Sequence, residues 1–281
     1  MRVGRIPYLN CAPVYGAVDR GIVRLDAELV SGVPSALNRQ MSDGVLDISV
    51  ISAVEYARES AKYVLLPDLA ISCDGPVRSV MLFSTRPASE LQDAQVLVSR
   101  SSMTSVALLE LLFEQVWKTR PVFVPGDAEA DDLQRDHAPV AARLVIGDAA
   151  LMLRHRAHPV AQGHGQEYSY IYDLGAEWKA WTGLPFVFAV WVARRDVDVR
   201  AALALHGALI ESRNWGLANI DRLAEELAPA CHLPPMIVHQ YLAGLDYGLG
   251  LPYLEGLSEF FRRLERVGKV PQGKLVFLPA A

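Results

Sequence analysis

The feature that most constrains this fold is the change of composition within residues 170–194, where a polar, aromatic stretch leads directly into an apolar one. The apolar run, residues 186–192, is too short to span a membrane and shows no polar alternation. We therefore expect a strand buried on both faces, of the kind found in parallel sheets. Taken alone, such a strand would also fit an ordinary protein core.

A second segment of the same character, residues 75–85, lies about a hundred residues earlier in the chain. This spacing is expected when a chain leaves one lobe, builds a second lobe and returns. We predict that residues 1–86 and 185–281 form the first lobe and residues 87–184 the second. A ligand would then bind in the cleft between the lobes.

Short apolar segments alternate with amphipathic segments along the chain. Strands are expected at residues 2–6, 24–31 and 47–52, and helices at 12–19, 35–41 and 54–59. The alternation predicts a two-lobed α/β fold with mixed, mainly parallel sheets flanked by helices and joined by two hinge crossings. Residues 127–136 are predicted to form an acidic, solvated segment, and residues 158–166 a surface excursion.

Charge and cysteine content exclude several classes of protein. The net charge of −5 and the scattered Lys and Arg residues argue against nucleic-acid or membrane partners, so a small molecule is the expected partner. Three widely spaced cysteines, Cys11, Cys73 and Cys231, form neither a disulfide framework nor a zinc pattern. Residues 1–7 lack the apolar core of a secretion signal, so we expect a cytoplasmic location.

Motifs for cofactors and metals are missing from the sequence. It contains no G-x-G-x-x-G, G-x-x-x-x-G-K-[ST] or G-x-S-x-G pattern, which leaves dinucleotide, triphosphate and acyl-enzyme chemistry unsupported. His155, His158 and His164 lack an acidic or cysteine partner at helical spacing. We therefore predict neither a cofactor nor a metal.

Two polar clusters are expected where the first lobe meets the cleft. Asn10 follows the opening strand, and its amide is suited to hold a hydroxyl or carboxylate; alternatively it caps a helix. Arg78 and Ser79 lie at the first crossing. Arg78 would bind a carboxylate or form a structural ion pair, and Ser79 would orient a leaving hydroxyl or satisfy the backbone at a strand end.

Two further clusters are expected on the second lobe. The run 101–105 contains Ser102, Thr104 and Ser105 at the start of a helix, where free amides and the helix dipole favour an anion. A simple cap needs only one hydroxyl. Asp148, between a predicted strand and a helix, would act as a base, an acceptor or a cap. Together the clusters predict a site for an anionic small molecule with few catalytic bases.

Five ordered motifs give the chain a close resemblance to the chorismate dehydratases of the futalosine route to menaquinone. They are R-V-G-R-I-P-Y-L-N, G-P-V-R-S-V, S-M-T-S, L-V-I-G-D-A-A-L and Y-D-L-G-A-E-W-K-A-W-T-G-L-P-F-V-F-A-V-W. The resemblance covers nearly the whole chain. It implies the type II periplasmic-binding-protein fold, which agrees with the two lobes and two crossings inferred from the residues.

The resemblance also implies a reaction, the loss of water from chorismate to give 3-[(1-carboxyvinyl)oxy]benzoate. It assigns Asn10 and Ser79 as residues that orient the substrate near its ring. Helix-terminus physics adds Ser102, Thr104 and Ser105 as ligands of a substrate carboxylate, with Arg78 and Asp148 as weaker candidates. Because Asp148 is the sole acid inside the clusters, the enolpyruvyl carboxylate of the substrate is a candidate for the base.

Two other functions remain open at the level of sequence. One is a cytosolic module that binds or senses a small anion without chemistry, because fold does not fix function. The other is the sister enzyme of the same pathway, 1,4-dihydroxy-6-naphthoate synthase. For that enzyme we would expect an N-terminal motif rich in Ser, Pro and Asn followed by Asp, and a catalytic His, and Y-L-N-C-A-P lacks these features.

Overall fold

The structure is a computed structural model of the 281-residue chain and describes residues 1–100, 102–129, 140–156 and 168–279. The predicted surface excursion at residues 158–166 lies outside the described residues, as do Ser101 and most of the predicted acidic segment 127–136.

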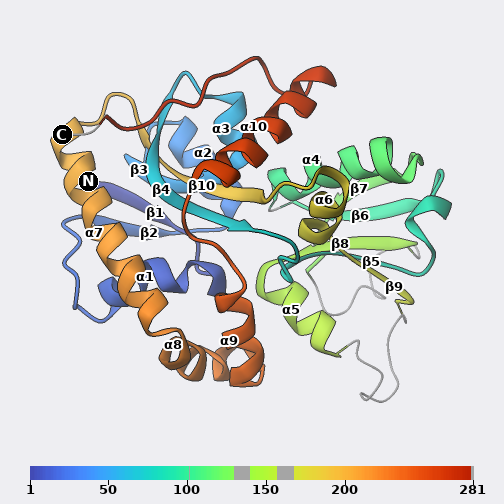
Figure 1. Ribbon diagram of the computed structural model, residues 1–281, viewed down its shortest axis with the longest axis horizontal. Coiled ribbons are helices and arrows are strands. Elements are labelled where there is room, and N and C mark those ends of the chain that lie inside the picture. Colours follow the sequence, from blue (N-terminus) through green and yellow to red (C-terminus); the bar gives the residue numbers. More distant parts are fainter. Residues whose placement is uncertain (101, 130–139, 157–167, 280–281) are drawn as a thin grey trace.

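The described residues form two five-stranded sheets that lie side by side (Figure 1). The first sheet has the order β2-β1-β3-β10-β4, with β1 (Arg2–Arg5), β2 (Glu28–Ser31), β3 (Ile48–Ser52), β4 (Tyr63–Cys73) and β10 (Phe186–Arg194). The second has the order β7-β6-β8-β5-β9, with β5 (Val80–Ser84), β6 (Gln95–Ser99), β7 (Val122–Gly126), β8 (Ala142–Ile146) and β9 (Tyr170–Asp173).

Both sheets are mixed, but the expectation that they are mainly parallel is wrong. β1 and β6 each pair in parallel with two neighbours, whereas β10 and β5 are antiparallel to both of theirs. The reason is that β5 and β10 are the first strands after each crossing. They start beside the carboxyl ends of their neighbours, so Val80 pairs with Ile146 and Phe186 with Cys73.

The apolar run that follows the second crossing is confirmed as a buried strand. β10 is an interior strand of the first sheet, between β3 and β4, and all but two of its residues are buried. Cys73 ends β4 in the first sheet, and Val80 begins β5 in the second sheet. β5 therefore belongs to the second sheet, although the predicted range of the first lobe includes residues 80–84. We place the outgoing crossing at residues 74–79; the lobe ranges themselves stay a prediction.

Helices begin where strands end, at the edge where the two sheets face each other. β1 leads into the short η1 (Leu9–Cys11) and α1, β3 into α3, β6 into α4 and β8 into α5. The helices are α1 (Ala12–Asp19), α2 (Pro34–Ser42), α3 (Ala53–Arg58), α4 (Met103–Leu112), α5 (Gly147–Arg156), α6 (Leu174–Thr182), α7 (Val199–Ala218), α8 (Ile220–Leu227), α9 (Pro235–Ala243) and α10 (Leu251–Arg266), with shorter turns η2 (Ala88–Glu90), η3 (Phe113–Trp117) and η4 (Pro229–Cys231). Within the described ranges, no helix is both long and apolar enough to traverse a lipid bilayer.

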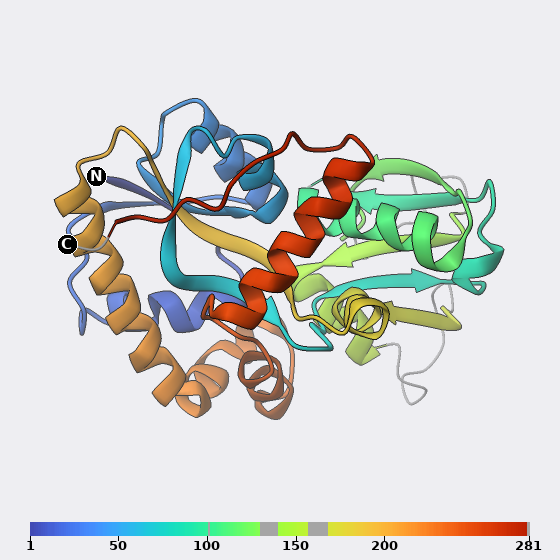
Figure 2. The ribbon, with the colours of Figure 1, turned by 45° about the horizontal axis from the view of Figure 1, so that its top comes forward.

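Helix α10 braces the two halves of the molecule, and Figure 2 shows it lying across their junction. The return crossing is the segment between α6 and β10. Gly256 of α10 packs against it so closely that a Cβ atom on residue 256 would lie 2.0 Å from the carbonyl oxygen of Pro185. The same carbonyl accepts a 3.1 Å hydrogen bond from Trp178 Nε1. The return crossing is therefore held between α6 and α10.

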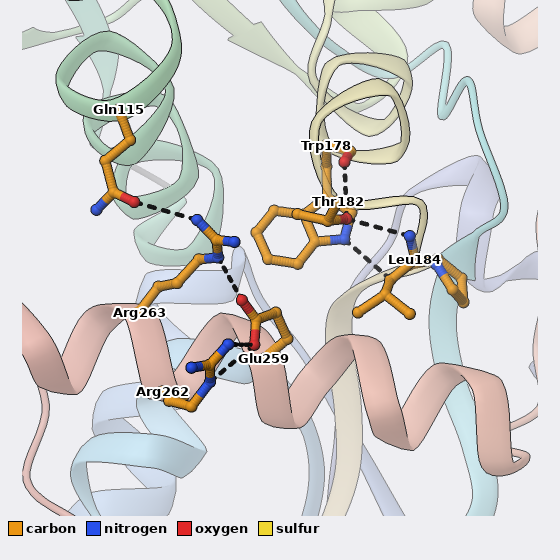
Figure 3. A network of polar contacts seen from close by, with 8 residues as sticks. Gln115, Trp178, Thr182, Leu184, Glu259, Arg262 and Arg263 are labelled. Atoms are coloured by element: carbon orange, nitrogen blue, oxygen red, sulfur yellow. Dashed lines mark hydrogen bonds and ion pairs between the residues drawn. The ribbon is translucent and has the colours of Figure 1, made fainter.

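Arg263 extends this brace toward the second sheet (Figure 3). Its guanidinium donates to Glu259 at 2.6 Å and to Gln115, in η3, at 3.1 Å. It also lies 3.8 Å from the centroid of the Trp181 ring, a favourable cation–π arrangement. One side chain of α10 thus contacts both η3 and α6.

Replacing Gly256 by Ala tests this close packing. Gly to Ala within a helix normally stabilises by about 0.5–1 kcal/mol, but a Cβ 2.0 Å from a backbone oxygen forces the helix away. We expect Gly256→Ala to lower the free energy of unfolding in urea by about 1–3 kcal/mol. Gly207→Ala in α7, with nothing within 4 Å of the added Cβ, is the matched control and should stabilise. Equal stability of the two variants would show that α10 is free to shift.

Candidate functional site

A pocket lies between the two sheets, at the edge where the strands end and the helices begin. Five of the seven predicted site residues line it, namely Asn10, Ser79, Ser102, Thr104 and Ser105. They come from η1, the outgoing crossing and the start of α4, so both halves of the molecule contribute. A larger cavity of about 300 Å³ lies between α3, α10 and residues 271–275, and none of the predicted residues lines it.

Asn10 presents an unsatisfied acceptor to this pocket. Its amide oxygen Oδ1 is buried and has no hydrogen-bond partner among the residues that the structure describes. The alternative role as a helix cap is not observed, because the N-cap positions of η1 and α1 are Tyr8 and Cys11. Since a buried acceptor without a partner is costly, the geometry favours a ligand as the missing donor.

Ser79 also lines the pocket. It is 3% exposed, and its hydroxyl donates over a long 3.5 Å to the carbonyl of Val77. The main-chain carbonyl of Ser79 accepts from Gly147 at 2.8 Å, which fixes the residue beside the start of α5. The backbone of Ser79 is therefore held while its hydroxyl stays available.

The start of α4 combines capping with free donors. Ser102 is the N-cap, since its hydroxyl accepts from the Ser105 amide at 3.3 Å and also bonds the Ser105 hydroxyl at 2.7 Å. The Thr104 hydroxyl accepts from the amide of Val54 at 3.2 Å, across the two halves of the molecule. One hydrogen of the serine pair and the hydrogen of Thr104 remain able to point at a ligand, together with the first-turn amides.

Arg78 does not line the pocket, so its predicted role as a substrate ligand stays a prediction. Its backbone adopts a left-handed conformation with φ of 64°. The side chain consequently turns toward α9, where the guanidinium donates to the carbonyl of Gln240. Arg78 thus stabilises the carboxyl end of a helix, a position that favours a cation.

Asp148 also lies behind the pocket wall instead of in it. Its carboxylate accepts from the amide of Leu9 at 3.1 Å and so caps η1 from the other half of the molecule. Burial raises the pKa of Asp148 from 3.8 to about 6, and the Leu9 amide opposes part of that rise. The adjacent Gly147 has a φ of 63°, and the Tyr8 ring packs so close to it that a Cβ atom on residue 147 would lie 3.3 Å from the ring. Asp148 is therefore placed to position Asn10, and its predicted role as a substrate ligand stays a prediction.

No charged side chain of the described residues lines the pocket. Among the described residues, its lining contains no Asp, Glu, Lys, Arg or His. Positive potential instead comes from the amino-terminal ends of α2, α4 and α5, whose Pro34, Ser102 and Gly147 reach the pocket. The pocket holds about 70 Å³, less than the roughly 300–1,000 Å³ of typical ligand sites, so we infer that the halves separate to admit a ligand.

Sequence reasoning missed two residues that shape this site. Tyr8 lines the pocket, and burial raises its pKa to about 12, with smaller contributions from Glu129 and Asp148. The Asp173 carboxylate accepts from the amides of Val77 and Arg78 and so holds the crossing that carries Ser79. The position of Asp173 directly before a helix was the available signal. Within the described residues no cluster suited to a metal is present, while His158 and His164 lie outside them.

Comparison with known sequences identifies relatives over nearly the full length. A family model described as menaquinone biosynthesis matches residues 1–266. The chorismate dehydratase of Thermus thermophilus is 31% identical over 261 residues, which cover 92% of each chain. The 1,4-dihydroxy-6-naphtoate synthase of the same organism is 25% identical over 282 residues, which cover 95% of each chain.

Comparison with solved structures confirms the predicted periplasmic-binding-protein fold. A protein of Archaeoglobus fulgidus superimposes with a TM-score of 0.77 and 21% identity, covering 96% of this chain and 98% of that one. The periplasmic aliphatic sulphonate binding protein SsuA of Escherichia coli gives a TM-score of 0.65 and 14% identity, with 98% and 95% coverage. At these identities the likeness establishes the fold alone.

Proposed function

Because this chain belongs to the menaquinone biosynthesis family, we propose that it is a chorismate dehydratase. It would remove water from chorismate to give 3-[(1-carboxyvinyl)oxy]benzoate, a reaction of a small-molecule dicarboxylate. The dehydratase is the more similar of the two Thermus relatives, which favours this reaction over the sister synthase. The cytoplasmic location stays part of the proposal.

One observation in the structure carries the proposal, the buried and unpartnered amide oxygen of Asn10 in the same pocket as the Ser79 hydroxyl. An acceptor and a hydroxyl from different segments thus line one pocket, and no described group donates a hydrogen bond to the Asn10 oxygen. A substrate hydroxyl supplies the missing donor, and Ser79 donates in turn to the oxygen that leaves.

The start of α4 would hold a carboxylate of the substrate. Ser102, Thr104 and Ser105 supply hydroxyls, and the first-turn amides supply the positive end of the helix dipole. In the reaction the ring loses a proton, the hydroxyl leaves with its bonding electrons, and the two combine as water. Aromatisation drives this step, so the protein chiefly orients the substrate and stabilises developing charge. The elimination is redox-neutral and requires no redox cofactor.

The enolpyruvyl carboxylate of the substrate serves as the base in this proposal. No Asp, Glu, Lys, Arg or His lines the described part of the pocket, and burial raises the pKa of its titratable groups, Tyr8 and Cys11. The carboxylates nearby, Asp148 and Glu129, raise the pKa of Tyr8 by their charge but are not part of the lining. A carboxylate already attached to the ring through an ether oxygen needs no protein group to bring it near the ring proton.

The decisive experiment incubates the purified protein with chorismate, without added cofactor or metal, and follows the products by mass spectrometry. We expect a product lighter by one water with an aromatic absorbance. Unchanged chorismate that raises the melting temperature would instead identify a binding or sensor module without catalysis. Unchanged chorismate without any thermal effect would contradict the proposed substrate.

Substitutions in the pocket test the two orienting residues. Asn10→Ala and Ser79→Ala should each lower kcat by more than about tenfold, because misplacing the reacting groups removes the benefit of orientation. Ser72→Ala is the matched control, since Ser72 is fully buried but donates to Asp246, away from the pocket. It should affect stability without affecting turnover. Wild-type kcat in both pocket variants, measured on folded protein, would contradict their roles.

Asp148→Asn distinguishes a catalytic base supplied by the protein from one supplied by the substrate. The amide oxygen still accepts from Leu9, so we expect turnover to fall less than tenfold, whereas loss of a general base costs about 10²–10⁴-fold. Because burial raises the pKa of Asp148 to about 6, its ionisation opposes folding above that pH. The variant should therefore gain stability, at most about 3 kcal/mol, above pH 6 and none below about pH 4 in urea denaturation. Abolished turnover with intact chorismate binding would make Asp148 the base.

A further inference from the structure

A buried hydroxyl that the described residues leave without a hydrogen bond of normal geometry lies next to Ser79. It belongs to Tyr241 in α9, which is 1% exposed. Its neighbour is the Ser79 hydroxyl, which opposes part of the rise that burial produces in the pKa of Tyr241. Ser79 lines the pocket and Tyr241 does not, so Tyr241 approaches Ser79 from behind the pocket wall.

The packing of α9 against the outgoing crossing fixes this juxtaposition. Arg78 donates to the carbonyl of Gln240, the residue before Tyr241. A Cβ at Gly244, just past the end of α9, would lie 2.4 Å from the Arg78 guanidinium, so the helix end and the crossing are in tight contact. The contact that removes Arg78 from the pocket therefore also brings Tyr241 to Ser79.

A buried hydroxyl without a hydrogen bond weakens the fold, because its water shell is lost and not replaced. Phenylalanine would fill the same space without that cost. The orphaned hydroxyl is explained if its bond to Ser79 reaches normal geometry only when substrate is bound, as the Ser79 hydroxyl leaves the Val77 carbonyl and turns its hydrogen toward the pocket. In that orientation a lone pair of the Ser79 oxygen faces Tyr241 and accepts from it.

We propose that Tyr241 is a positioning residue for the dehydration, donating a hydrogen bond to Ser79 while Ser79 donates to the leaving hydroxyl of the substrate. This role rests on the proposed function of the site. A chain of two hydrogen bonds strengthens the terminal donor, because each bond polarises the next. Negative charge that develops on the departing oxygen is thereby spread over two hydroxyls, and no proton need leave Tyr241.

Tyr241→Phe tests this role, with Tyr247→Phe as the matched control. Tyr247 is 2% exposed, and its hydroxyl contacts the carbonyl of Leu242 at 3.5 Å without contacting Ser79. We expect Tyr241→Phe to lower kcat by about three- to tenfold, the usual worth of one hydrogen bond, with KM changed less than twofold. Its melting temperature should stay level or rise. Tyr247→Phe should keep the wild-type kcat.

A double-mutant cycle identifies Ser79 as the route of the effect. In a Ser79→Ala background, Tyr241→Phe should cause no further loss of kcat, because the group on which it acts is gone. Independent, multiplying losses in the double variant would overturn the proposal, as would wild-type kcat in Tyr241→Phe. A lowered melting temperature or equal losses in both phenylalanine variants would assign the hydroxyl to packing and also overturn it. Failure of the wild-type protein to convert chorismate would instead reject the proposed function, and this role with it.

Discussion

The carboxylate of Asp173 ties the outgoing crossing to the start of α6. One oxygen accepts from two amides of the first turn of α6 and from the amide of Val77, at 2.9–3.1 Å, and the other accepts from Arg78 at 2.7 Å. These bonds hold Arg78 in a left-handed conformation that is uncommon for a residue with a side chain. That conformation sends Arg78 outward to α9 and turns Ser79 into the pocket.

Sequence reasoning succeeded where local pattern determines the outcome. The apolar run at residues 186–192 had to become a buried strand, because no other environment suits such a segment of that length. Residues that follow strands, such as Asn10, or that begin helices, such as Ser102 and Thr104, were expected to converge because the carboxyl ends of strands gather at one edge. The pocket brings five of seven predicted residues together for this reason. Their chemical roles remain proposals.

The remaining features depend on contacts that no local pattern encodes. The antiparallel direction of β5 and β10 follows from where the chain enters each sheet, and residue composition carries no such information. Arg78 was assigned to the ligand because its type suits a carboxylate, whereas a backbone angle fixed by Asp173, nearly a hundred residues away, turns it elsewhere. Tyr241 lies in a helix that reads as ordinary core until its unpartnered hydroxyl is placed beside Ser79.

The interior position of β10 sets an order on the assembly of the molecule. β10 lies between β3 and β4, yet it follows them in the chain only after the strands of the second sheet. The second sheet can therefore form from a continuous stretch, while the first must wait for an interior strand to return over more than a hundred residues. Pairings of such long range form slowly. The sheet whose strands come first in the chain is thus the sheet that is completed last.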